Sequence, residues 1–274
     1  MQLKFKENDF QSFEPIPYLN EYFDYPSDNY GGVGIENEQF LQFFAQVAHE
    51  HNLNNSLLLD FGCGPTIYSI VSLGNNCREI HMSDYLQQNL DQVKLWQQGN
   101  PQVFDWNPYL RRALQMETAL NQNKSTDSSL NITDEQVQQR ATLLQQKITS
   151  IRQGNARAIN PVGEEGKALY EAVVSSFCLE GVAEDVAEWK KLITNLSSTI
   201  KLGGLLIFAT QIEADSYRIG DGYGTVVNLS EEYIVQTLLD CNFEPGSIKT
   251  KQLNGGLNHT EYEKFLMLTA RLAF

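Results

Sequence analysis

Two glycines that follow a short apolar segment are the residues of this sequence best placed to support ligand chemistry. Residues 56–61 (SLLLDF) run into 62–65 (GCGP), a pattern that predicts a buried strand ending in a tight turn. Glycines there let the backbone pass close to a ligand, where a Cβ atom would collide with it. Asp84 follows at the end of the next predicted strand, 79–83, and an acid in that place accepts hydrogen bonds from a ribose diol. The spacing therefore predicts a nucleotide-like site.

The turn lacks two features of dinucleotide-binding loops. Ile67 stands where the pattern G-x-G-x-x-G has its third glycine, and Pro65 has no backbone N–H to donate to a pyrophosphate. A cofactor without a pyrophosphate fits better, and we expect S-adenosylmethionine. A nucleotide-dependent oxidoreductase is disfavoured for the same reasons, whereas a strand-end turn that binds nothing would show the same pair of glycines.

Alternating strands and helices must position these residues. The patterns predict strands at 56–61, 79–83, 168–175 and 205–210, and helices at 35–51, 66–73, 86–97, 133–151, 184–200 and 230–241. This alternation is typical of an α/β fold with a mostly parallel sheet. Two further strand-like segments, 247–253 and 264–272, have only a short link and should form an antiparallel hairpin at one side. The prolines at 15, 17 and 26 predict that no helix forms at the start of the chain.

Six segments carry a resemblance to a known family. They are 18–23 (YLNEYF), 60–68 (DFGCGPTIY), 83–85 (SDY) with 89–90 (NL), 104–108 (FDWNP), 175–180 (SSFCLE) and 201–204 (KLGG). Together they resemble the nicotinamide, phenylethanolamine and thioether methyltransferases, a family of class I enzymes that act on small molecules. The resemblance covers roughly residues 18–271.

The resemblance implies a Rossmann-like class I methyltransferase fold, with a mostly parallel seven-stranded sheet, a terminal antiparallel hairpin and helices on both faces. We expect one methyltransferase domain over 1–274, in which 1–50 cap the active site. Residues 107–153 contain too few apolar residues for a core of their own, so we expect a polar helical insertion or a crossover layer there and not a separate domain.

The resemblance also assigns the cofactor contacts by position. Four residues should contact the methionine part, two N-terminal tyrosines should close over it, and others should hold the ribose and the adenine. The methionine set is Gly62, Gly64, Thr66 and Tyr68 with Ser176 in the pocket wall, and the tyrosines are Tyr18 and Tyr22. The ribose pair is Asp84 and Asn89, the adenine pair is Asn155 and Ala156, and Tyr85 is a further cofactor contact.

The implied reaction is methyl transfer to a nucleophile, and a protonated amine would need a nearby carboxylate to accept its proton. Glu180 is the first candidate for that role, and Glu213 and Asp215 are further catalytic candidates. The resemblance makes Tyr217 a wall of the substrate pocket and His259 and Glu261 substrate contacts. The nicotinamide branch has Asp where Thr210 falls, which argues against nicotinamide as substrate.

We therefore expect an N-methyltransferase of a small cationic amine. The same scaffold could instead methylate a pyridine, a thioether or a hydroxyl, or could bind the cofactor without catalysis.

Composition limits the partners. The chain has 274 residues and a formal net charge of −14, which argues against a nucleic-acid or anionic-membrane surface. Its four cysteines are scattered without zinc-site spacing, so we expect no metal. We find no signal peptide pattern and expect a cytoplasmic monomer, with a role in specialised metabolism.

Overall fold

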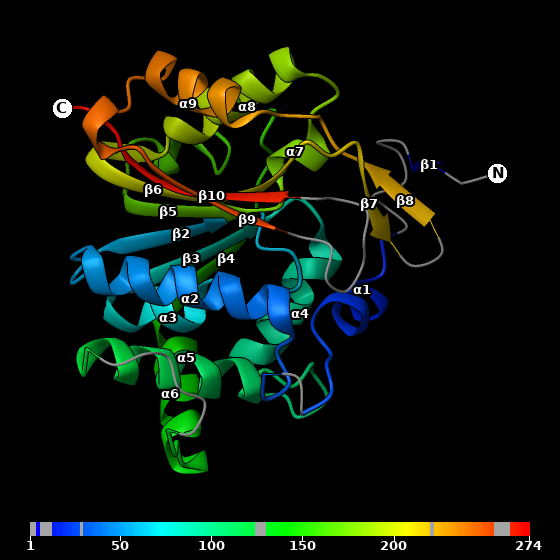
Figure 1. Ribbon diagram of the computed structural model, residues 1–274, viewed down its shortest axis with the longest axis vertical. Coiled ribbons are helices and arrows are strands. Elements are labelled where there is room, and N and C mark those ends of the chain that lie inside the picture. Colours follow the sequence, from blue (N-terminus) through cyan, green and yellow to red (C-terminus); the bar gives the residue numbers. More distant parts are fainter. Residues whose placement is uncertain (1–3, 6–12, 28–29, 124–129, 220–221, 255–263) are drawn as a thin grey trace.

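A seven-stranded sheet lies at the centre of the computed structural model, which describes residues 4–5, 13–27, 30–123, 130–219, 222–254 and 264–274 (Figure 1). Its strand order is β4-β3-β2-β5-β6-β10-β9. The strands are β2 Leu57–Phe61, β3 Glu79–Asp84, β4 Ile148–Gln153, β5 Tyr170–Ser176, β6 Ile200–Ile212, β9 Lys249–Asn254 and β10 Lys264–Arg271. The first five pair in parallel, and β10 is antiparallel to both β6 and β9. This confirms the predicted mostly parallel sheet and its antiparallel hairpin.

Helices cover both faces of the sheet, because successive side chains of a buried strand point to opposite sides. Leu58 packs on one face with the larger group of helices, and Leu57 and Leu59 pack on the other face with the smaller group. The larger group is α2 Ile35–Glu50, α3 Ile70–Asn76, α4 Gln87–Gln97, α5 Asn107–Asn121 and α6 Asp134–Lys147, and the smaller is α7 Leu179–Val182, α8 Val186–Ser197 and α9 Glu231–Asp240. None of the described helices combines the length and apolar character needed to cross a membrane.

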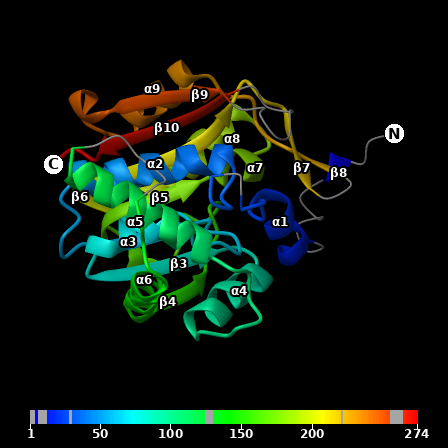
Figure 2. The same cartoon turned by 60° about the horizontal axis from the view of Figure 1, so that its bottom comes forward.

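A second, small sheet and a short helix gather beyond one end of the main sheet (Figures 1 and 2). The sheet has the order β1-β8-β7, with β1 Lys4–Phe5, β7 Ser216–Ile219 and β8 Gly222–Thr225, and the helix is α1 Pro15–Tyr22. The Tyr22 hydroxyl donates to the Arg218 carbonyl oxygen at 2.5 Å, and the Arg218 guanidinium lies 3.0 Å from the Glu21 carboxylate. These contacts join the N-terminal region to the β7–β8 hairpin.

The prediction that prolines prevent a helix at the start of the chain is wrong. Helix α1 begins at Pro15 and includes Pro17. The first backbone N–H groups of a helix have no partner within it, so a proline in the first turn removes no hydrogen bond.

The expected helix over 133–151 also needs correction, and residues 107–153 form part of the layers of the fold. Helix α6 ends at Lys147, and the next six residues form β4, which pairs with β3 at the edge of the main sheet. Three of the four residues at 148–151 (ITSI) are β-branched, which favours a strand. Helix α5 buries Tyr109, Leu110 and Met116 in the core, so this segment is an integral layer of the fold.

Candidate active site

The turn after β2 depends on its glycines. Gly62 has φ 70° and Gly64 has φ 58°, a region that residues with a side chain rarely adopt. A Cβ atom on Gly62 would lie 2.2 Å from the Sγ atom of Cys178, whereas one on Gly64 would meet no atom within 4 Å. The first glycine thus allows close packing against the segment after β5, and the second leaves open space where a ligand can approach the backbone.

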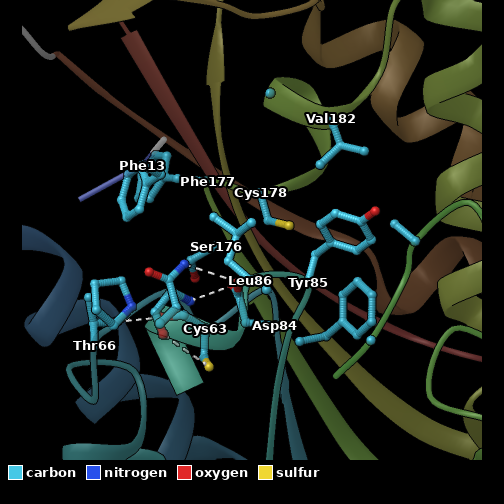
Figure 3. Close-up of a pocket in the computed structure, with 18 of the residues that line it drawn as sticks. Phe13, Cys63, Thr66, Asp84, Tyr85, Leu86, Ser176, Phe177, Cys178 and Val182 are labelled. Carbon is cyan, nitrogen blue, oxygen red and sulfur yellow. Dashed lines mark hydrogen bonds between the residues drawn. The ribbon is translucent and has the colours of Figure 1, made fainter. Parts of the chain in front are cut away.

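Asp84 fixes this turn to the end of β3. Its Oδ2 accepts a hydrogen bond from the Gly64 N–H at 2.9 Å, and its Oδ1 accepts from the Leu86 N–H at 2.9 Å and from the Asn89 amide at 3.0 Å (Figure 3). Burial nevertheless raises the pKa of the Asp84 carboxyl above its usual range. The carboxylate therefore also organises the glycine turn, a role that the sequence did not indicate.

A cavity of about 320 Å³ opens at these strand ends (Figure 3). It brings together eleven of the twelve residues predicted to bind the cofactor. They are Tyr18, Gly62, Gly64, Thr66, Tyr68, Asp84, Tyr85, Asn89, Asn155, Ala156 and Ser176. Tyr22, the twelfth, lines a smaller neighbouring cavity instead.

Several lining residues were not predicted. Phe13, Leu86, Arg157 and Val182 line the larger cavity and lie outside the quoted motif positions. Phe177 belongs to the 175–180 motif but was given no role. Its φ of 52° is uncommon for an aromatic residue, and its N–H donates to the Ala209 carbonyl oxygen at 2.9 Å. This conformation turns the chain after β5 so that neighbouring side chains reach the cavity.

The larger cavity has the donor and acceptor pattern expected for S-adenosylmethionine. The Asn89 amide nitrogen is used by Asp84, but its buried Oδ1 accepts no hydrogen bond from any described residue, which leaves it for a ribose hydroxyl. The open space beside Gly64 gives the cofactor an approach to the backbone. Asn155 is exposed, and its Oδ1 accepts from the Arg157 N–H at 2.9 Å with a second lone pair remaining for an adenine amine.

The smaller cavity, of about 70 Å³, adjoins the larger one through a common wall. Five residues line both cavities: Tyr18, Tyr68, Phe177, Gly181 and Tyr217. Half of its other described lining residues are aromatic, and its polar ones are Glu36, Asn37, Glu180 and Gln211. No Lys, Arg or His occurs among these described lining residues, so the charged groups facing the cavity are acids.

Glu180 follows β5 in α7 and is almost completely buried, with 1% of its surface exposed. Its Oε1 accepts a hydrogen bond from the Gln211 N–H at 3.4 Å, while no described residue donates to its Oε2. Burial raises the pKa of this carboxyl to about 7. A buried carboxyl with this pKa can take up a proton near neutral pH.

The other two predicted catalytic acids do not line either of these two cavities. Glu213 is exposed and forms an ion pair with Lys264 at 2.8 Å, and Asp215 is exposed and accepts from the Asn228 amide at 3.1 Å. Ala214 between them is buried in the core, so the two acids face outward. Tyr217 lines both cavities, whereas His259 and Glu261 lie outside the described residues.

Comparison with known proteins shows the family of the chain. Residues 2–272 match the sequence model of the NNMT/PNMT/TEMT family. Phenylethanolamine N-methyltransferase of Rattus norvegicus is 28% identical over 246 residues, which cover 88% of this chain and 80% of that protein. Human nicotinamide N-methyltransferase is 24% identical over 238 residues, covering 87% and 84%.

Solved structures share the fold. The magnesium protoporphyrin IX methyltransferase of Synechocystis PCC 6803, solved with bound S-adenosylmethionine, has a TM-score of 0.55 and 15% sequence identity, covering 96% of this chain and 94% of that chain. A methyltransferase of Methanosarcina mazei has a TM-score of 0.51 and 15% identity, covering 83% and 98%.

Proposed function

The chain belongs to the NNMT/PNMT/TEMT family of S-adenosylmethionine-dependent methyltransferases, and on that premise we propose that it methylates the amine nitrogen of a small, cationic metabolite. The proposal rests above all on Glu180, a buried carboxyl in an aromatic cavity that shares a wall with the larger cavity. A cation gains from the carboxylates of Glu36 and Glu180 and from the faces of the surrounding rings.

The larger cavity holds the cofactor in this proposal. Asp84 and Asn89 hold the ribose beside Tyr85, and Asn155 and Ala156 flank the adenine. The methionine part lies against Gly62, Gly64, Thr66, Tyr68 and Ser176. Tyr18 closes over it from the N-terminal segment, and Tyr22 fixes that segment through its bond to the β7–β8 hairpin.

S-adenosylmethionine, when bound, would supply a sulfonium methyl group whose S–C bond breaks as the amine lone pair attacks the methyl carbon in line, so that a neutral thioether leaves. The residues of this chain align the two reactants and free the lone pair. Tyr18, Tyr68 and Tyr217 contact both cavities and so limit how the amine faces the methyl group. Glu180 accepts a proton from the entering ammonium, because its raised pKa makes it a stronger base than an exposed glutamate.

We also expect a cytoplasmic monomer without a nucleic-acid partner, in a specialised metabolic pathway. The acidic composition supports the absence of a polyanionic partner.

A panel of methyl acceptors tests the function. Purified enzyme and labelled S-adenosylmethionine are incubated with phenylethanolamine, an indolethylamine, a guanidino-amine, nicotinamide and a thioether, and the methylated products are measured. We expect transfer to primary amines. Transfer confined to nicotinamide or the thioether, or to none of them, would contradict the proposal.

Two matched variants test the role of Glu180. Glu180→Gln removes the buried proton acceptor and should reduce kcat for the best amine about 100-fold. Asp215→Asn removes an exposed acid outside both cavities and should leave kcat unchanged. Turnover of the Glu180 variant near that of the wild type would show that another group takes the proton.

A further inference from the structure

We propose that Gln211, together with Glu180, binds both N–H groups of a primary amine and thereby limits the enzyme to one methyl transfer per amine; this deepens the proposed function and rests on it. Gln211 lies near the end of β6 with 7% of its surface exposed, and it lines the smaller cavity. No motif and no comparison assigns it a role.

Two buried oxygen atoms in this cavity lack hydrogen-bond donors among the described residues. They are Oε1 of Gln211 and Oε2 of Glu180. The two residues are neighbours, because the Gln211 N–H donates to the other carboxyl oxygen of Glu180. Most buried polar atoms of folded proteins have a partner, so two buried acceptors on contacting residues that line one cavity indicate a ligand with two donors.

The remaining amide in the cavity wall has a structural use. Asn37 donates through its Nδ2 to the Tyr22 carbonyl oxygen at 2.7 Å and to the Tyr109 hydroxyl at 2.8 Å, which ties α2 to α1 and α5. The side-chain amide oxygen of Gln211 accepts no hydrogen bond from any described residue, and the backbone N–H of the same residue donates to the proposed base.

A neutral primary amine matches this pair of acceptors. It has two N–H groups, one for Gln211 and one for Glu180, and its single lone pair remains for the methyl group. The Glu180 carboxyl still accepts this bond after it has taken the proton of the incoming ammonium, since a protonated carboxyl keeps free lone pairs. Pyridines and thioethers have no N–H group and would leave both acceptors without donors.

The number of N–H groups also opposes the transfer of a second methyl group to the same amine. In the first transfer the N–CH₃ bond forms as the S–CH₃ bond breaks, which gives a secondary ammonium and the neutral thioether S-adenosylhomocysteine. To react again, the product must lose a proton, and it then has one N–H group for two acceptors. Its new methyl group must also face one of the buried oxygens, so reaction with the secondary amine should be slow.

The test begins with the wild-type enzyme and the best primary amine of the panel, with phenylethanolamine as the first probe. The amine, its N-methyl derivative and its N,N-dimethyl derivative are compared by kcat/KM, and mass spectrometry counts the methyl groups in the final product. We expect one methyl group and a preference of about 10- to 100-fold for the primary amine, the range for one lost hydrogen bond to a charged or buried group.

Three variants identify the residue responsible. Gln211→Met keeps the side-chain length without the amide oxygen, and it should bring kcat/KM for the primary and secondary amines within about threefold of each other. Gln211→Glu keeps an oxygen in place and should retain the preference. Gln139→Met, on the exposed face of α6, is the matched control and should behave as the wild type. Calorimetry should give unchanged S-adenosylmethionine affinity for all three.

The outcomes separate the two proposals. Methylation of only nicotinamide or the thioether contradicts the amine function and this inference with it. Methylation of primary and secondary amines at equal rates by the wild type keeps the function and overturns the role of Gln211. An undiminished preference in Gln211→Met also overturns it. If Gln211→Met does not fold, the Gln211→Glu variant decides. Loss of its preference for the primary amine overturns the proposal, whereas a retained preference together with a single methyl group in the wild-type product supports the proposal.

Discussion

Lowering the pH from 8 to 6 should reduce kcat/KM for the amine about tenfold, because the reaction needs Glu180 as a carboxylate. Burial raises the pKa of this group to about 7. Protonation therefore occurs at a higher pH than for an exposed glutamate, and at pH 6 only about a tenth of the enzyme has the carboxylate form. A glutamate with its usual pKa would remain almost fully ionised at pH 6, and the rate would then change little.

The assay is kcat/KM for the amine at saturating S-adenosylmethionine, measured between pH 5.5 and 9. Two amines of different pKa should give the same midpoint near 7, since the midpoint belongs to the free enzyme. A midpoint that moves with the pKa of the amine would show that the substrate, and not Glu180, titrates.

A second buried acid makes a necessary control. Asp60 is in β2, two residues before the first glycine of the turn, and its carboxylate accepts a hydrogen bond from the Ser69 hydroxyl. Burial raises the pKa of this carboxyl to about 7 as well. Asp60→Asn should retain the acidic decrease in rate, whereas Glu180→Gln should remove it and leave a low, flat profile. The reasoning is refuted if the wild-type midpoint lies near 4.5, or if the decrease persists in Glu180→Gln.

Three further changes test the site. Asp84→Ala should weaken S-adenosylmethionine binding by about 2 kcal/mol, roughly 30-fold, in calorimetry; unchanged affinity would place the ribose elsewhere. Gly62→Ala should lower the melting temperature strongly, because its Cβ would lie 2.2 Å from the Cys178 Sγ atom, whereas Gly99→Ala, at the same φ of 70° but in open space, should cost only about 1 kcal/mol. Equal losses would contradict the packing explanation. Glu213→Gln should change kcat/KM less than about twofold, because an exposed ion pair contributes little; a tenfold loss would return this acid to the site.

The sequence was sufficient to predict the position of a site residue where the local sequence pattern and the topology of the sheet together determine it. The strand that ends at Phe61 and the strand that ends at Asp84 are neighbours in a parallel sheet, so residues that follow them meet at one edge. That rule placed the glycine turn beside Asp84 without knowledge of any side-chain packing. The family motifs added Tyr18 and Tyr217, which lie far from this edge in sequence but line the cavity.

Tertiary packing decided what the sequence left open. Glu180, Glu213 and Asp215 are all acids that follow strands, but only Glu180 is buried against a cavity. The direction of a side chain after a strand depends on the turn that follows, and that turn depends on distant contacts. Gln211 received no individual role because a single neutral residue in an apolar strand carries no motif, and only the assembled cavity shows its unused acceptor.

The net charge of −14 does not by itself account for a site that binds a cation. Exposed acids such as Glu213 and Asp215 act through water and salt, which screen their fields over roughly 8 Å at physiological ionic strength. Glu180 lies in an aromatic cavity, where the effective dielectric constant is lower and the attraction of an ammonium is correspondingly larger. The same burial that raises its pKa in the free enzyme therefore makes the carboxyl respond strongly to an entering cation. The buried acids of this cavity, together with the neutral side-chain oxygen of Gln211, can select the amine in a way that the many surface acids cannot.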